Sequence, residues 1–196
     1  KETVREIHAS GAKAYITLNT LVFESELPKL KELLSKIEEC QVDSLIIQDL
    51  GVARLAARLA PSVHLHASTQ MTLSDGCGAR FAKNLGFQRV VLARELSAAE
   101  IAEVKKEADC ELEVFALGAL CVSFSGQCLA SLTWGGRSAN RGQCAQPCRL
   151  PFRWAAVPHG QKLDFSRGQV KLSSPSHLLS PCDLAGFNKI DELIRA

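Results

Sequence analysis

The chain has 196 residues, of which 46% are hydrophobic and 22% charged, and its formal net charge is +2. This length allows one domain with a sizeable core but falls short of the roughly 250 residues typical of a closed eight-fold β/α barrel. The composition excludes a disordered acidic or basic tail, and the near-neutral charge gives no global argument for a nucleic-acid-binding surface. No apolar run reaches the ~18 residues of a membrane-spanning helix.

The first 115 residues alternate between helix and strand patterns. Between 25 and 40, leucines recur at helical spacing with Lys and Glu between them. The short apolar run at 44–47 lacks polar alternation, as expected for a strand buried on both faces of a parallel sheet. In chain order, the patterns predict helices over 1–10, 25–40, 53–59, 75–85 and 98–107, and strands over 14–18, 44–47, 63–66, 89–92 and 112–115.

Five strands separated by helices fit either a β/α barrel or a doubly wound sheet. Polar residues follow the strands, and in a β/α barrel such positions converge on the rim where active sites lie. We therefore expect an α/β fold with most of a TIM-like barrel in 1–115, lacking at least its first strands. The cysteine-rich segment 116–155 follows. Residues 156–196 then belong to the same domain, with a loop or hairpin over 156–176 and a terminal helix over 183–195.

The candidate rim residues are polar side chains just after the predicted strands. His66 could act as an acid or base, or could be a hydrogen-bonded scaffold group. Arg94 and Glu95 could clamp an anionic substrate or form an internal ion pair. We expect all of them at the carboxyl end of one parallel sheet: Asn19, Asp49, His66, Gln70, Arg94 and Glu95.

The eight cysteines are unevenly distributed along the chain. Secreted disulfide frameworks are usually smaller and richer in loops, so we expect a reducing intracellular compartment, either the cytoplasm or an organelle. Cys40, Cys77 and Cys110 are then simple core residues. Four others crowd into 28 residues as a metal or redox site: Cys121, Cys128, Cys144 and Cys148.

The spacing of these four cysteines favours a larger metal group. Six residues separate Cys121 from Cys128, and three separate Cys144 from Cys148. Structural zinc knuckles favour cysteine pairs separated by two residues, whereas longer gaps suit a larger group such as a four-iron cluster. A 4Fe–4S cluster is expected, and zinc remains the alternative.

Two cysteine blocks resemble the signatures of peptidase family U32, the collagenase-like family. They read EVFALGALCVSFSGQCLAS at 113–131 and GGRSANRGQCAQPCR at 135–149. Shorter stretches at 18–20, 48–51, 66–70, 91–96 and 178–184 also look like the family. The sequence is most similar to the branch linked to hydroxylation of a cytidine in ribosomal RNA, and another branch acts on tRNA.

The resemblance implies a β/α barrel with the cysteine segment beside its rim. It implies a 4Fe–4S cluster on the four cysteines, catalytic roles for His66, Arg94 and Glu95, and substrate contacts for the other rim residues. It also implies RNA or a ribonucleoprotein particle as partner, and Arg137, Arg141 and Arg149 could meet phosphates there or could offset the thiolate charge.

The sequence departs from the family pattern at three positions. Leu117 and Phe124 stand where the family offers His and Tyr, which removes two groups able to donate protons. Cys182, where Lys is common, is expected to be a thiol outside the cluster. We therefore expect the chain to be part of a longer protein or assembly and catalytically incompetent alone.

Two other functions stay open. One is a non-catalytic structural subunit of a larger assembly. The other is a peptidase, as the family name implies, although neither Gly-x-Ser-x-Gly nor His-Glu-x-x-His occurs in the sequence. Four ligated thiolates would also leave no cysteine obviously free as a nucleophile.

Overall fold

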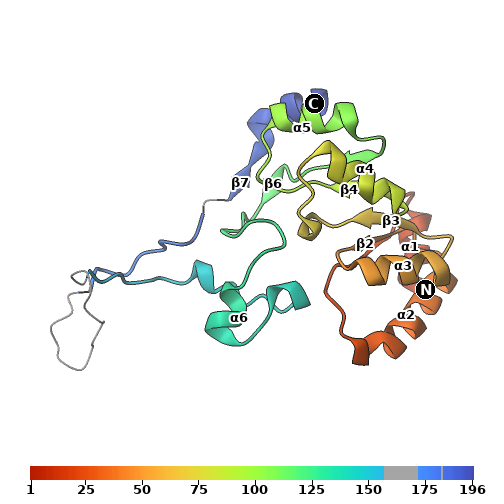
Figure 1. The fold of residues 1–196 in the computed structure, drawn as a ribbon, viewed down its shortest axis with the longest axis horizontal. Coiled ribbons are helices and arrows are strands. Elements are labelled where there is room, and N and C mark those ends of the chain that lie inside the picture. The colour runs from red at the N-terminus through yellow and green to blue at the C-terminus, as the bar shows by residue number, and fades with distance from the viewer. Residues whose placement is uncertain (157–171, 182) are drawn as a thin grey trace.

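The computed structural model describes residues 1–156, 172–181 and 183–196 (Figure 1). Strands and helices alternate through the first part of the chain, as the sequence predicts. The strands of this part are β1 (Tyr15–Leu18), β2 (Ser44–Ile47), β3 (His64–Ala67), β4 (Phe87–Val91) and β5 (Glu111–Glu113). The helices are α1 (Glu2–Ala9), α2 (Leu27–Cys40), α3 (Leu50–Leu59), α4 (Gly76–Asn84) and α5 (Ala98–Glu107), with 3-10 turns η1 (Glu24–Glu26) and η2 (Thr69–Met71).

The five strands form one parallel sheet in the order β1-β2-β3-β4-β5. Each strand therefore lies beside the next one along the chain. A doubly wound sheet reverses its strand order at a switch point, whereas a β/α barrel adds its strands in sequence. The order is consistent with a partial TIM-like barrel and decides between the two folds that the sequence left open.

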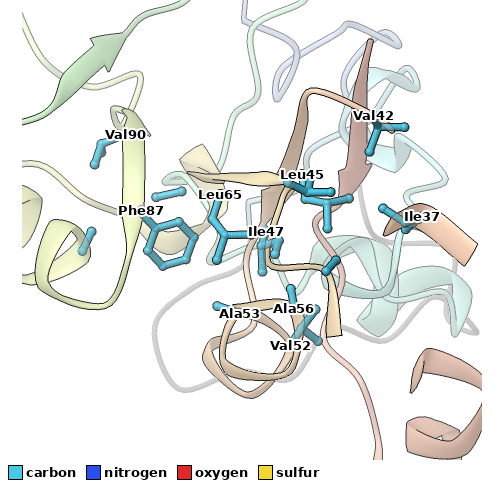
Figure 2. Close-up of a cluster of buried hydrophobic side chains, with 14 of the residues drawn as sticks. Ile37, Val42, Leu45, Ile47, Val52, Ala53, Ala56, Leu65, Phe87 and Val90 are labelled. Carbon is cyan, nitrogen blue, oxygen red and sulfur yellow. The ribbon is translucent and has the colours of Figure 1, made fainter. Parts of the chain in front are cut away.

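The hydrophobic core lies between the outer face of this sheet and the helices. Alternate strand residues point outward, and Leu45, Ile47 and Leu65 pack against the buried face of α3 (Figure 2). Because side chains alternate between the two faces of a strand, the remaining positions face the inner side. That inner side is polar, with Tyr15 on β1, Ser44 on β2 and Arg89 on β4.

Three helices begin at a side-chain cap just after a strand or turn. The caps are Asp49 for α3, Asp75 for α4 and Ser97 for α5, and each accepts a hydrogen bond from a backbone amide of the first turn. The sequence predicted a start of α3 at 53, and the helix begins earlier because Asp49 satisfies the free amides of its first turn.

After β5 the chain has little regular structure. It contains the short helix α6 (Ala130–Gly135), which the sequence did not predict, the turns η3 (Ala139–Arg141) and η4 (Pro147–Arg149), and the antiparallel pair β6 (Leu117–Gly118) and β7 (Leu184–Ala185). From residue 112 onward, Ser125 and Ser131 are the only described residues that are buried. This part of the chain therefore has no apolar core of its own among the described residues.

The end of the chain returns to the sheet domain. The predicted helix over 183–195 is shorter in the structure, where η5 (Gly186–Lys189) leads into α7 (Ile190–Arg195) and α7 packs beside α5 (Figure 1). The predicted loop or hairpin over 156–176 falls largely outside the described residues, as does Cys182. On the described side, Phe152 and Ala155 form antiparallel bridges with Ser176 and Leu172.

No helix in the described parts of the chain combines the length and the hydropathy that crossing a membrane requires.

Candidate functional site

The carboxyl edge of the sheet gathers five of the six candidate rim residues. Asn19 follows β1, Asp49 follows β2, and Gln70 lies in η2 just after β3. Arg94 and Glu95 follow β4. Because all five strands run parallel, these residues lie at the same end of the sheet.

His66 is not brought to this edge. It lies within β3, its side chain is buried, and its Nε2 is 3.1 Å from the hydroxyl of Ser44 at the start of β2. Its ring meets the Tyr15 ring edge-on with the centroids 5.1 Å apart. Burial, with the nearby Arg89 charge, lowers the pKa of His66, so the imidazole is neutral at neutral pH. This geometry favours the scaffold interpretation over the acid–base one.

Asp49 is occupied by backbone amides. Its Oδ1 accepts hydrogen bonds from the amides of Gly51 at 2.7 Å and Val52 at 3.1 Å, and its Oδ2 accepts from the amide of Val22 at 3.2 Å. The carboxylate thus caps α3 and also fixes the loop after β1. Its oxygens are therefore already engaged in holding the edge together.

The loop between Cys121 and Cys128 is bound to the same edge through Ser125. The carboxylate of Glu95 accepts hydrogen bonds from the Ser125 amide at 3.0 Å and from its hydroxyl at 3.0 Å. The Arg94 amide donates to the Ser125 hydroxyl at 3.2 Å. Thr72 donates to the Ser125 carbonyl at 2.6 Å. Arg94 and Glu95 therefore contact the cysteine loop, and no ion pair joins them to each other.

Gly126 brings the cysteine loop into backbone contact with the edge. Its φ of +76° lies in the left-handed region, and a Cβ at this position would stand 1.9 Å from the carbonyl oxygen of Gln70. Only glycine permits both the conformation and the approach. Gln70 therefore supports the loop with its backbone.

The second cysteine block docks on the loop after β1. The Leu21 amide donates to the Asn140 carbonyl at 2.9 Å, and Arg141 binds the Glu26 carboxylate with one nitrogen at 2.8 Å. The Arg141 guanidinium also lies 4.4 Å from the centroid of the Phe23 ring. The two blocks thus attach to the edge at separate places, one near β1 and one near β3 and β4.

Ser131 connects the two cysteine blocks. This buried residue of α6 accepts a hydrogen bond through its hydroxyl from the amide of Ala145 at 2.9 Å. Ala145 directly follows Cys144, and α6 packs against η4, which carries Cys148. The Ser131 hydroxyl and the packing of α6 on η4 therefore help to hold the first pair of cysteines beside the second.

The four thiols share one electrostatic neighbourhood. The pKa of Cys148 is raised by burial first and then by charge on Cys121, Cys144 and Cys128, while Arg149 lowers it. Charges influence one another in this way only across short distances. Within the described residues, no group of three or more His, Cys, Asp or Glu side chains is arranged to hold a metal ion. The convergence of the four sulfurs on one cluster stays a prediction.

The donor set suits an iron–sulfur cluster in kind. Thiolates are the ligands such clusters prefer, and all seven described cysteines are free thiols. A positively charged metal group would offset the negative charge of four thiolates.

A small cavity lies between Arg94 and the segment that leads to Cys121. Its volume is about 120 Å³, and Phe115, Leu117, Gly118 and Leu120 contribute to its wall. The buried Nε of Arg94 and the buried Oε1 atoms of Gln48 and Gln70 have no hydrogen-bond partner among the described residues. Unpaired buried polar atoms are costly, so they mark this edge as a place for water or a bound group.

The surface around the cysteines is positively charged and aromatic. Between residues 114 and 156 the sequence contains no Asp or Glu but four arginines, namely Arg137, Arg141, Arg149 and Arg153. Arg141 and Arg149 form ion pairs with Glu26 and Asp183, whereas Arg137 is exposed and pairs with no described residue. Trp134 is exposed and lies against Phe152 with the ring centroids 5.5 Å apart, and Trp154 is exposed nearby in sequence.

Sequence reasoning missed the two serines that organise the site. Ser125 and Ser131 lie within a run of small and polar residues, where nothing local distinguishes a buried hydroxyl from an exposed one. The one usable signal is the neighbouring Gly126, because a glycine between two cysteines indicates a close backbone approach.

Comparison with known proteins places the chain. Residues 1–196 match Peptidase family U32 over their whole length. The chain is 41% identical over 182 residues to a 23S rRNA 5-hydroxycytidine synthase of Escherichia coli K12, covering 93% of this chain and 26% of that protein. It is 41% identical over 155 residues to tRNA hydroxylation protein P of Helicobacter pylori strain J99, covering 79% of this chain and 37% of that protein.

A solved structure, that of the U32 peptidase Mk0906, shares the fold. Its TM-score is 0.52 at 13% sequence identity, and the match covers 60% of this chain and 51% of that one. The chain thus spans about half of that structure and about a quarter to two fifths of the two curated relatives named above. With the family match running from the first residue to the last, the chain belongs to peptidase family U32.

Proposed function

We propose that this chain is the cluster-binding part of an RNA-hydroxylating protein of the U32 family. The single observation that carries the proposal is the hydrogen bond from the Ala145 amide to the Ser131 hydroxyl at 2.9 Å, which brings the block of Cys144 and Cys148 beside the helix that follows Cys128. The relatives named for ribosomal and transfer RNA hydroxylation support the choice of reaction.

The proposed cofactor is a 4Fe–4S cluster, which Cys121, Cys128, Cys144 and Cys148 would hold. Such a cluster would supply electron transfer at the carboxyl edge of the sheet. The chain's own residues perform the positioning, because the edge and the cysteine loop share hydrogen bonds through Ser125. Asp49 holds the loop after β1, on which the second cysteine block rests.

The proposed partner is RNA with an unpaired base at the site. The segment 114–156, which contains no Asp or Glu, offers arginines to phosphates, and exposed Trp134 offers a face on which a base can stack. In this proposal the target base approaches the cavity beside Arg94, whose guanidinium donates to base oxygens or ring nitrogens.

The test measures cofactor content before activity. The chain is purified anaerobically and analysed for iron, sulfide and its EPR spectrum after reduction, alongside Cys148→Ser and Cys110→Ser. Cys110 is the matched control, because its pKa is also raised by burial but it lies before β5. We expect four irons and four sulfides in the wild type and in Cys110→Ser, and loss of the cluster in Cys148→Ser.

Activity is then tested on RNA and on protein. The loaded chain, alone and joined to the remaining length of a relative, is incubated with ribosomal and transfer RNA, and mass spectrometry measures any added oxygen atom. One bound zinc in place of iron would make the site structural. Cleavage of gelatin without RNA modification would replace this proposal with the peptidase one.

A further inference from the structure

Two buried serines stand out in the cysteine segment. Ser125 and Ser131 are both 0% exposed, although their neighbours in the segment are half-buried or exposed. Burying a hydroxyl without a partner costs free energy, so each serine must be held by hydrogen bonds. Each one is, and the partners differ in a way that matters for the cysteines.

Ser125 binds the cysteine loop to the sheet. Its amide and hydroxyl both donate to the Glu95 carboxylate at 3.0 Å, and its carbonyl accepts from Thr72 at 2.6 Å. All three polar groups of one residue are thus engaged by the edge that follows β3 and β4. Ser125 stands four residues after Cys121 and three before Cys128, so its position sets where both thiols lie.

Ser131 binds the two cysteine blocks to each other. Its hydroxyl accepts from Ala145, and its carbonyl accepts from the Arg137 amide at 3.3 Å. It stands three residues after Cys128, and its partner Ala145 stands one residue after Cys144. The Ser131 hydroxyl is therefore one link between the two pairs of cysteines, and the Arg149 guanidinium, which donates to the Leu120 carbonyl at 3.1 Å, is another.

We propose that Ser125 and Ser131 are positioning residues that bring the four cysteines into one metal-binding site, with Ser125 anchoring the site to the sheet and Ser131 joining its two halves. This inference rests on the proposed cluster site and deepens it. Neither serine ligates the metal group, and each acts through the backbone that carries the cysteines. Outer partners of this kind typically change metal affinity by roughly ten- to a hundred-fold when removed.

The segment offers matched controls. Ser123 lies in the same loop as Ser125, and its side chain makes no hydrogen bond with any described residue. Ser138 plays the same part for Ser131, because only its backbone carbonyl is used. Ser123→Ala and Ser138→Ala remove the same hydroxyl as the test variants without touching the proposed anchors.

Thr72 permits a second test from outside the cysteine segment. Thr72→Val keeps the shape and the branching of the side chain but removes the hydroxyl that donates to Ser125. Thr72→Ser keeps that donor. Because neither change alters the loop itself, this pair stays informative where Ser125→Ala fails to fold.

The experiment titrates the full 196-residue chain with cobalt(II) under anaerobic conditions. Cobalt(II) is the probe because its absorption bands report how many thiolates bind it. We expect the wild type, Ser123→Ala, Ser138→Ala and Thr72→Ser to show four thiolates. We expect Ser125→Ala and Thr72→Val to weaken binding by roughly ten-fold or more with the sheet intact by circular dichroism. Ser131→Ala is expected to show fewer than four thiolates.

Two results would overturn the inference in distinguishable ways. Unchanged affinity and unchanged bands in Ser125→Ala, Ser131→Ala and Thr72→Val would leave the metal site standing and remove the serines from it. Absence of thiolate bands in the wild type would remove both the shared site and its anchors. RNA modification is not read in this experiment, so a failure of the hydroxylation proposal alone leaves its outcome unchanged.

Discussion

The Nε2 of His66 lies 3.1 Å from the hydroxyl of Ser44, a contact between two neighbouring strands on the inner face of the sheet. The other ring nitrogen, Nδ1, is buried and has no partner among the described residues. This environment favours the neutral imidazole, with one N–H, because the second N–H of the charged form would be buried without an acceptor.

This contact predicts how stability depends on pH. The folded pKa of His66 lies below its ordinary value of 6.5 because of burial, so the unfolded chain binds the extra proton first as pH falls. The contribution of His66 to stability is therefore complete above pH 6.5 and declines as pH falls below it.

The measurement compares thermal unfolding of the wild type and His66→Gln between pH 7.5 and pH 5. Glutamine keeps a hydrogen bond to Ser44 but does not titrate. We expect the midpoint of the wild type to fall more steeply than that of the variant. Parallel curves would mean that His66 is free to take up its proton in the folded state.

Asp49 is predicted to matter for stability rather than for substrate. Asp49→Ala removes a helix cap and the bond to Val22, and caps of this kind are worth about 1 kcal/mol. Urea unfolding should show a loss of roughly 1–2 kcal/mol, mostly restored in Asp49→Asn. Asp75 caps α4 through the Gly78 amide alone. Asp75→Ala is therefore the control and should lower the free energy of unfolding by less. Loss of RNA binding in Asp49→Asn at full stability would instead restore the substrate-binding role.

Gly126→Ala should release the cysteine loop from the sheet. The added methyl would meet the Gln70 carbonyl oxygen, and the residue would also have to keep a φ of +76°. Gly11→Ala isolates the second effect, because Gly11 has the same φ and nothing within 4 Å of the added Cβ. That control should cost about 1 kcal/mol.

Hydrogen exchange separates the two glycine variants. We expect Gly126→Ala to accelerate amide exchange across 121–128 by roughly ten-fold or more, while Gly11→Ala leaves those amides unchanged. Equal exchange in this loop for both variants would contradict the close contact with Gln70.

Arg89 is predicted to hold β5 on the sheet. It donates to Glu111 at 2.7 Å and 2.8 Å and to Glu113 at 3.1 Å, which leaves both carboxylates facing one cation. Arg89→Met should raise the pKa of Glu111, which Arg89 holds below its ordinary range, and should speed amide exchange in β5. Arg89→Lys should restore only part of the slow amide exchange in β5, because an ammonium lacks the planar fork with which the guanidinium engages both carboxylates. Raising the salt concentration should speed amide exchange in β5 of the wild type, so that it approaches the rate in Arg89→Met, because salt screens the ion pairs.

The repeating part of the fold could be predicted from the sequence. Leucines at helical spacing in α2 and the apolar run of β2 reflect local periodicity and burial, which a sequence carries directly. The prediction of α5 over 98–107 is confirmed at both ends, since Ser97 and Glu100 form a capping box.

The site could be predicted only in part. Residues such as Arg94 follow a strand, and parallel topology places them at the edge as predicted. That Glu95 would bind Ser125, 30 residues later in the chain, depends on where the cysteine segment folds back, and no local pattern encodes this return. His66 was expected just after a strand but lies within β3. A shift of one residue in the strand boundary is enough to move a side chain from the edge to the inner face of the sheet.

The burial of two serines in place of a hydrophobic core has a calorimetric consequence. Heat capacity and denaturant sensitivity both scale with the apolar surface that becomes exposed on opening. No hydrophobic residue of the described cysteine segment is buried. Detachment of this segment from the sheet edge should therefore change the heat capacity little and depend only weakly on urea. Calorimetry would then record only the unfolding of the sheet domain. The cysteine segment would detach at lower temperatures without a separate heat-absorption peak.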